Sequence, residues 1–220
     1  MSAYYALAHA DRIELLTDGA VYHEDGTLTD IRQKVWTSSR LPFAVTGRGT
    51  MSVVSLLAIA AVACTILGTV DEAIERFQAA LNQMAERIDS AEFELAICAI
   101  SETSGPVILY ASGLDAYGTG IETFRLHDAG KELGGGPAVD PAGLDLSDGL
   151  RGCGVELFER MRAIQDCNPA RPDLPDHHGI GGHVDLTIVS AAGCTTERLH
   201  EWTDVIGLKI TPIAELLKVA

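Results

Sequence analysis

Residues 2–49 decide the fold of this chain, and their sequence is SAYYALAHADRIELLTDGAVYHEDGTLTDIRQKVWTSSRLPFAVTGRG. A small hydroxyl residue, Ser2, follows Met1 directly. Asp18 comes 16 positions after Ser2, and Lys34 comes 32 positions after it. A glycine-containing turn at 47–49 follows a short apolar run. One series of short expected strands therefore carries a hydroxyl, a carboxylate, an ammonium group and a glycine turn.

These groups can form a hydrolytic site if Met1 is removed, which the small side chain of Ser2 favours. The freed α-amine, with an unperturbed pKa of about 8, can then accept the Ser2 hydroxyl proton at neutral pH. A nearby Lys34 ammonium would favour the alkoxide, and Asp18 would keep that lysine charged and oriented. The backbone N–H of Gly47 can face a developing oxyanion because no side chain is in the way.

The stretch resembles the start of the proteasome β-subunit branch of the N-terminal nucleophile (Ntn) hydrolases. In that family a Thr opens the mature chain, where this chain has Ser2. Asp18 and Lys34 fall at the family's separations without a gap, and Gly47 fits with a shift of one. The close match covers about the first quarter of the chain. The resemblance implies an α+β fold, namely a four-layer αββα sandwich that spans residues 1–220 as one domain.

The resemblance also implies a function and partners. It indicates a peptidase or amidohydrolase with Ser2, Asp18 and Lys34 as catalytic residues and Gly47 as the oxyanion donor. The substrate would be a peptide or amide, with no cofactor and no metal. The chain would form a homo-oligomer, for which a ring is one arrangement. The alternative is a non-catalytic subunit that uses the fold for assembly, as the family's α-type subunits do.

Each residue also has a simpler interpretation. Asp18 precedes Gly19, and Asp-Gly is a common turn pair. Lys34 can be a solvated strand residue, and serine is frequent after Met. The joint spacing is what favours the catalytic hypothesis over these separate explanations.

The composition disfavours several classes of protein. The net charge is −15, from 16 basic and 31 acidic residues, which disfavours binding to nucleic acids or anionic membranes. The apolar run at 53–67 is short for a membrane span and predicts a helix buried on most sides. No signal peptide is expected. Five cysteines without a CxxC pattern favour reduced thiols in a cytoplasmic protein: Cys64, Cys98, Cys153, Cys167 and Cys194.

Periodicity predicts a mixed order of strands and helices. Strands are expected at 3–9, 13–17, 33–37, 43–46, 93–100, 107–111, 123–126, 183–191 and around 209. Helices are expected at 51–67, 69–88, 150–165, 197–206 and 212–218, with Thr50 as a cap and Gly68 as the end of the first. Segments 128–148 and 168–182 are expected to be loops, and 22–26 a turn.

Two further groups of residues are candidates for function. Asp176, His177, His178, His183 and Asp185 have the side chains that bind zinc, but their spacing matches no closed zinc motif. The family places supporting Asp, Ser and Gly residues before a strand near the nucleophile. Here the segment 176–182 corresponds, with Gly181-Gly182 matching and Ile180 in place of the Ser.

The family's other supporting Ser comes from the loop before the third helix. Either Ser147 or Cys153 can lie there, and the sequence does not choose between them. The triple glycine at 134–136 is not a phosphate-binding loop, because no GK[ST] follows it.

Overall fold

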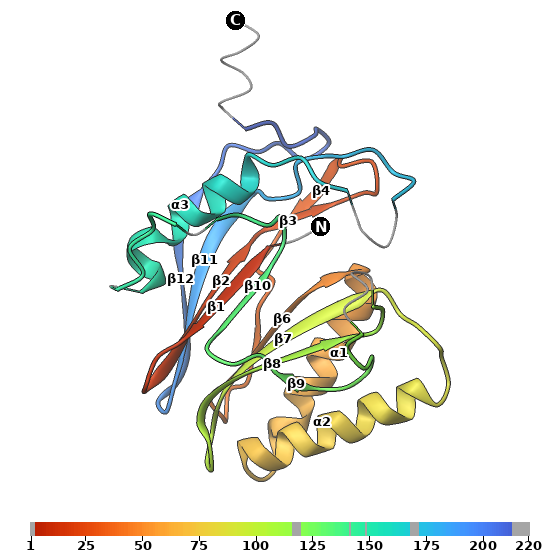
Figure 1. Ribbon diagram of the computed structural model, residues 1–220, viewed down its shortest axis with the longest axis vertical. Helices are drawn as coiled ribbons and strands as arrows, with labels where there is room; N and C mark the ends of the chain where they lie inside the picture. Colours follow the sequence, from red (N-terminus) through yellow and green to blue (C-terminus); the bar gives the residue numbers. More distant parts are fainter. Residues whose placement is uncertain (1–2, 116–119, 141, 148, 168–171, 213–220) are drawn as a thin grey trace, which may run out of the picture.

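The computed structural model describes residues 3–115, 120–140, 142–147, 149–167 and 172–212. Two five-stranded sheets form the centre of the molecule, and every strand pair in them is antiparallel. One helix packs on the outer side of the first sheet and two helices pack on the outer side of the second (Figure 1). The chain is thus a mixed α/β structure built on antiparallel sheets.

The first sheet has the strand order β10-β1-β2-β11-β12. A hairpin of β1 and β2 lies within it, as the sequence predicts, with Tyr4 opposite Thr17. Alternation along β2 sends Leu15 toward the second sheet and Leu16 toward the outer helix. The strands are β1 (Tyr4–Ala8), β2 (Arg12–Asp18), β10 (Glu132–Gly135), β11 (His183–Ser190) and β12 (Gly193–Glu201).

The second sheet has the order β5-β6-β7-β8-β9, and a separate two-stranded sheet pairs β3 with β4. The central strand β7 is almost fully buried, because a helix layer covers one face and the first sheet covers the other. The strands are β3 (Ala20–Tyr22), β4 (Leu28–Ile31), β5 (Trp36–Thr37), β6 (Phe43–Gly49), β7 (Phe93–Ser101), β8 (Gly105–Ser112) and β9 (His127–Asp128).

Among the described residues, three α-helices cover the sheets. Helices α1 (Met51–Ala63) and α2 (Val70–Ala85) pack on the second sheet, and α3 (Leu150–Arg162) packs on the first. A 3-10 turn, η1 (Cys64–Ile66), ends the α1 segment. Helix α2 begins with a capping box between Thr69 and Glu72, which satisfies two otherwise unpaired backbone N–H groups.

The hydrophobic core consists of layers between these elements. One cluster lies between the second sheet and α1 and α2, and another between the first sheet and α3. A third cluster, between the two sheets, includes Ala6, Leu15, Ala96 and Ile108. This interior buries the apolar strand faces that the alternation in the sequence predicts.

Several expected elements differ in the structure. The expected helix at 197–206 is not formed: residues 197–201 are the end of strand β12, because pairing with β11 extends the sheet there, and residues 202–206 are neither helix nor strand. The expected strand at 123–126 is a turn, in which Phe124 has a φ of +57°. The expected loop at 128–148 contains β10, and the expected strand at 33–37 is reduced to Trp36–Thr37. The segment 213–218 lies outside the described residues.

Helix α1 also departs from the sequence expectation. Thr50 occupies the N-cap position, but its side chain makes no capping bond and instead donates to Glu92. The helix is apolar all round, yet only one side is buried. Its segment exposes Leu56 and Leu67 by 68% and 72%, so the expectation of a helix buried on most sides is wrong.

Candidate functional site

Asp18 lies at the centre of the candidate site, at the end of β2, and its side chain is fully buried. One carboxylate oxygen, Oδ1, accepts the backbone N–H of Ala3 at 3.0 Å and the ammonium of Lys34 at 2.9 Å. The other oxygen, Oδ2, accepts the N–H of Ala20 at 3.1 Å and that of Gly181 at 3.4 Å. Asp18 therefore joins the start of β1, the Lys34 segment and the chain that leads into β11.

Lys34 is buried as deeply as its partner, with 2% of its side chain exposed. The interpretation of Lys34 as a solvated strand residue is therefore wrong. Burial lowers the pKa of Lys34 below its ordinary 10.5, while the Asp18 carboxylate opposes this change and Arg32 adds to it. The carbonyl of Lys34 accepts the Thr46 hydroxyl at 2.8 Å, which fixes this segment against β6. Ser2 lies outside the described residues, so the geometry begins at Ala3.

Gly47 follows Thr46 on β6, one residue from the contact with the Lys34 segment. Strand β5 pairs with β6 only at Ala44 and Val45, so its ladder ends before Gly47. A Cβ atom at position 47 would lie 2.3 Å from the Glu94 carbonyl oxygen on β7. The strands can approach this closely only because residue 47 has no side chain.

The segment before β11 is held by a second buried ion pair. The Arg162 guanidinium donates to both oxygens of Asp204, at 2.9 and 2.6 Å, and to the Ile180 carbonyl at 2.7 Å. Asp204 also accepts the N–H of Gly182 at 2.7 Å. Gly181 therefore lies between this pair and Asp18. The prediction that the Gly181-Gly182 stretch reaches the candidate site is confirmed.

The polar residues of the 176–185 segment do not gather at one point. Asp176 is exposed, and the His177 ring packs edge-on against Tyr22 with ring centroids 5.1 Å apart. His183 is buried against Gly19, where a Cβ atom would lie 2.4 Å from the imidazole. Its Nε2 is 3.1 Å from Asp185.

Asp185 in turn accepts from Arg198 at 3.0 Å. Although burial opposes the change, His183 and Arg198 lower the pKa of Asp185 below its ordinary value. In the part of the chain that the structure describes, no three His, Cys, Asp or Glu side chains are arranged to hold a metal ion.

The two candidates for a supporting group are each bonded within their own segment. Ser147 is exposed, and its hydroxyl donates to Asp145. Cys153 lies on α3, and its thiol donates to the carbonyl of Gly149 at 3.5 Å. The structure therefore favours neither of them as a partner of Asp18.

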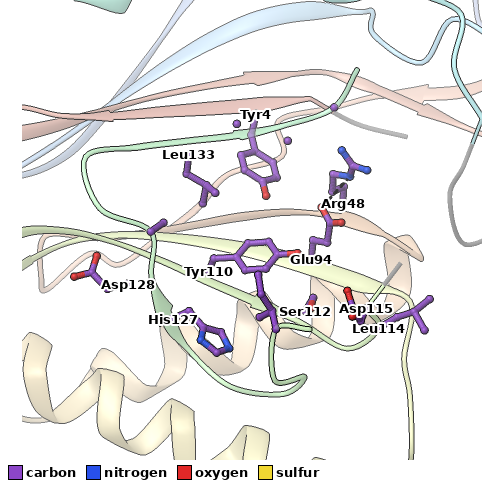
Figure 2. A pocket seen from close by; sticks show the side chains of 15 residues that line it. Tyr4, Arg48, Glu94, Tyr110, Ser112, Leu114, Asp115, His127, Asp128 and Leu133 are labelled. Carbon is purple, nitrogen blue, oxygen red and sulfur yellow. Dashed lines mark ion pairs between the residues drawn. The ribbon is translucent and has the colours of Figure 1, made fainter. Parts of the chain in front are cut away.

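A cavity of about 400 Å³ lies between the two sheets, beside this site. Tyr4 enters it from β1, one residue after Ala3, and Arg48 enters it from β6, one residue after Gly47. Figure 2 shows Tyr4 pointing toward Tyr110, whose side chain extends toward Glu94, with Arg48 nearby. Arg48 and Glu94 form an ion pair at 3.0 Å. Burial raises the pKa of Glu94, and Arg48 opposes this change.

Comparison with known proteins adds no relative to this picture. No family profile matches the chain, and no curated protein is significantly similar to it. In the described residues, no helix is long and apolar enough to cross a membrane.

Sequence reasoning missed the charged residues around Asp18 and Lys34. The local sequence around Arg48 indicates only a glycine turn. However, Thr46 and Arg48 are two residues apart on one strand, so both lie on the face toward the first sheet. Arg162 and Asp204 are 42 residues apart and lie on a helix and a loop, so no local pattern connects them. Tyr4 could have been found, because it lies at the start of β1 and, like Ala6, faces the interior between the sheets.

Proposed function

We propose that this protein is an Ntn hydrolase of the proteasome β-subunit type, a peptidase or amidohydrolase whose nucleophile is Ser2. The two facing sheets with helices on both outer sides are consistent with the four-layer αββα sandwich of that class. The match to the family's spacing at Ser2, Asp18 and Lys34 and the buried contact between the latter two support the same proposal. The protein would act on peptides or amides as a cytoplasmic homo-oligomer.

One observation carries the proposal, namely the double role of a single carboxylate oxygen. Asp18 Oδ1 accepts both the Lys34 ammonium and the N–H of Ala3, the residue that follows Ser2. A structural ion pair needs no bond to the first strand of the chain. Here that bond ties the backbone next to Ser2 to the carboxylate that orients the lysine. One carboxylate oxygen thus contacts both Lys34 and the residue that follows the proposed nucleophile.

The proposed chemistry follows from these positions once Met1 is removed. The Ser2 hydroxyl attacks the substrate carbonyl, and the α-amine of Ser2 accepts its proton. The amine then protonates the leaving nitrogen, and a water molecule hydrolyses the acyl-serine by the reverse proton transfers. Lys34, kept cationic by Asp18 against the effect of burial, stabilises the nucleophilic oxygen. The Gly47 N–H is the proposed donor to the tetrahedral oxyanion.

A mass measurement and a hydrolysis assay test this function together. The intact mass should correspond to a chain that begins at Ser2, because a retained Met1 would block the α-amine. Short fluorogenic peptides should be hydrolysed by the native chain and by neither Ser2→Ala nor Lys34→Arg, with all three proteins folded by circular dichroism. A native protein that lacks Met1, is folded and shows no turnover would overturn the catalytic proposal.

The second candidate is a non-catalytic subunit that serves assembly, and a different surface favours it. The segment 56–67, which includes most of α1 and all of η1, exposes four large apolar side chains: Leu56, Ile59, Ile66 and Leu67. Exposed apolar side chains that form a patch often mark a protein interface. Both candidates predict self-association larger than a dimer, and only the first predicts hydrolysis.

Light scattering at micromolar concentration tests the assembly. We expect a particle larger than a dimer for the native chain. The Leu56→Glu/Leu67→Glu variant should form a smaller particle in solution, because the substitutions would place charges in the interface. A native chain that scatters as a monomer would contradict the assembly expectation for both candidates.

A further inference from the structure

The triple glycine at 134–136 forms one side of the cavity between the sheets. Strand β10 is the terminal strand of the first sheet and β9 is the terminal strand of the second, so the cavity lies where two sheet edges meet. The Tyr4 ring fills the space that a side chain at Gly135 would need, because a Cβ there would lie 2.4 Å from it. Gly136 has a φ of +128°, which other residues rarely adopt.

Because glycine has no side chain, these three residues leave their backbone accessible to a ligand in the cavity. Gly134 has room for a side chain, since its nearest neighbour to a Cβ would be 3.4 Å away, yet it carries none. Glycine within a strand often marks a place where another backbone approaches closely. An extended peptide can pair with a sheet edge of this kind through backbone hydrogen bonds.

The charged lining of the cavity is predominantly acidic. The lining contains one cation, Arg48, and three carboxylates, which belong to Glu94, Asp115 and Asp128. Glu94 is 3.0 Å from Arg48, so the balance of formal charge in the lining remains negative. Such a lining disfavours an acidic occupant and attracts a cationic one. The half-buried ring of Tyr110 offers a surface over which a cation is also stabilised.

We propose that this cavity binds a lysine or arginine side chain of an extended peptide that lies against the edge of β10. The inference rests on the proposed function and names the substrate class of that hydrolase. The volume of about 400 Å³ is at the lower end of the usual range for ligand pockets, which suits one long side chain with part of its backbone. Tyr4 places the cavity beside the residues that follow Ser2.

Binding is measured on the full chain with Ser2→Ala, so that turnover cannot consume the ligand. The probes are three fluorescein-labelled, N-acetylated pentapeptides that differ only at the central residue, which is lysine, norleucine or glutamate. Fluorescence anisotropy should give about fivefold tighter binding for lysine than for norleucine, the size that a partly screened ion pair supports. This preference should weaken as salt is added.

A pair of matched variants locates the preference. Asp115→Asn removes a carboxylate of the lining, whereas Asp25→Asn removes an equally exposed carboxylate in the turn between β3 and β4. Each aspartate accepts a backbone N–H within its own segment, from Gly120 and Thr27 respectively. Asp115→Asn should reduce the lysine preference by at least about twofold, and Asp25→Asn should leave it unchanged.

The outcomes separate this inference from the proposed function. Preferred binding of the lysine peptide, lost in Asp115→Asn, supports the cavity assignment even if the native chain hydrolyses nothing. Equal binding of the three peptides overturns it, even if the native chain hydrolyses all of them. A lysine preference that Asp25→Asn reduces as much as Asp115→Asn also overturns it, because the net charge of the chain would then be the cause.

Discussion

Two buried ion pairs hold the same segment of chain from opposite sides, and they are built differently. Lys34 meets Asp18 through one ammonium at one oxygen, whereas Arg162 meets Asp204 through two parallel bonds. A guanidinium has a fixed fork that suits a structural clamp, and it stays charged at any ordinary pH. An ammonium is compact, and burial can change its charge. The Arg162 pair is therefore suited to holding Gly181, and the Lys34 pair to chemistry.

The largest expected effect comes from removing either cation. Lys34→Met or Arg162→Met should lower the free energy of unfolding by about 3–5 kcal/mol, because each leaves a buried carboxylate without its partner. Urea unfolding followed by circular dichroism measures both. Neutralising Asp18 as well, in Lys34→Met/Asp18→Asn, should recover part of the loss. Full stability in Lys34→Met would show that the Asp18 charge is not buried in solution.

Exchanging the two cations should separate their roles. Arg162→Lys should lower the free energy of unfolding by about 1–2 kcal/mol, because an ammonium cannot reproduce the parallel bonds to Asp204. If the proposed function holds, Lys34→Arg should reduce hydrolysis of a fluorogenic peptide at least about tenfold more than Arg162→Lys does, because a planar guanidinium cannot replace the compact charge of an ammonium. Rates are compared per folded molecule. Equal losses of turnover would remove the distinction between a catalytic and a structural pair.

A smaller effect is expected from a methyl group placed between the pairs. A Cβ at Gly181 would lie 2.5 Å from Asp204 Oδ2 and 2.8 Å from the Arg162 guanidinium. Gly181→Ala should therefore lower the free energy of unfolding by about 1–3 kcal/mol. Gly134→Ala is the control, since its Cβ would meet only ordinary contacts, and it should change stability by less than about 0.5 kcal/mol. Thermal melts that rank the two variants equally would contradict the tight packing at Gly181.

The smallest effect concerns pH. The pKa of Lys34 in the folded chain is below the 10.5 of the unfolded chain, so between these values the unfolded state binds more protons. The contribution of Lys34 to stability should rise with pH through that window, by at most about 1.4 kcal/mol per unit. The stability of the native chain relative to Lys34→Met should thus increase as the pH rises toward 10.5. Arg162→Met should show no such trend relative to the native chain.

The sequence predicted the parts of this site that depend on local order. Asp18 could be placed at the end of a strand because Ile13 to Thr17 form a short run before an Asp-Gly pair. Lys34 could be paired with it only through the family resemblance, since nothing in its neighbours indicates burial. Strand β12 was missed because Glu197 and Arg198 resemble a helix face in isolation. Pairing with β11 overrides that local preference.

The remaining features depend on contacts between distant parts of the chain. Three features join segments that are far apart in the sequence, so no local pattern predicts them. They are the Arg162–Asp204 pair, the cavity, and the packing of His183 against Gly19. The triple glycine at 134–136 lies in no local motif that indicates its role. Its contact with the Tyr4 ring, however, required the register of β1 with β10, which places Tyr4 opposite Gly135.

The bonding of Asp18 has a consequence for the order of folding during synthesis. Three of its partners are 15, 16 and 163 residues away in the chain, at Ala3, Lys34 and Gly181. The first two can form within an emerging hairpin and its neighbour, but the third requires most of the polypeptide to have left the ribosome. Contacts of such long separation form late, because chain entropy is lost before they stabilise anything. For most of its translation, a nascent chain therefore lacks the bond between Asp18 and Gly181.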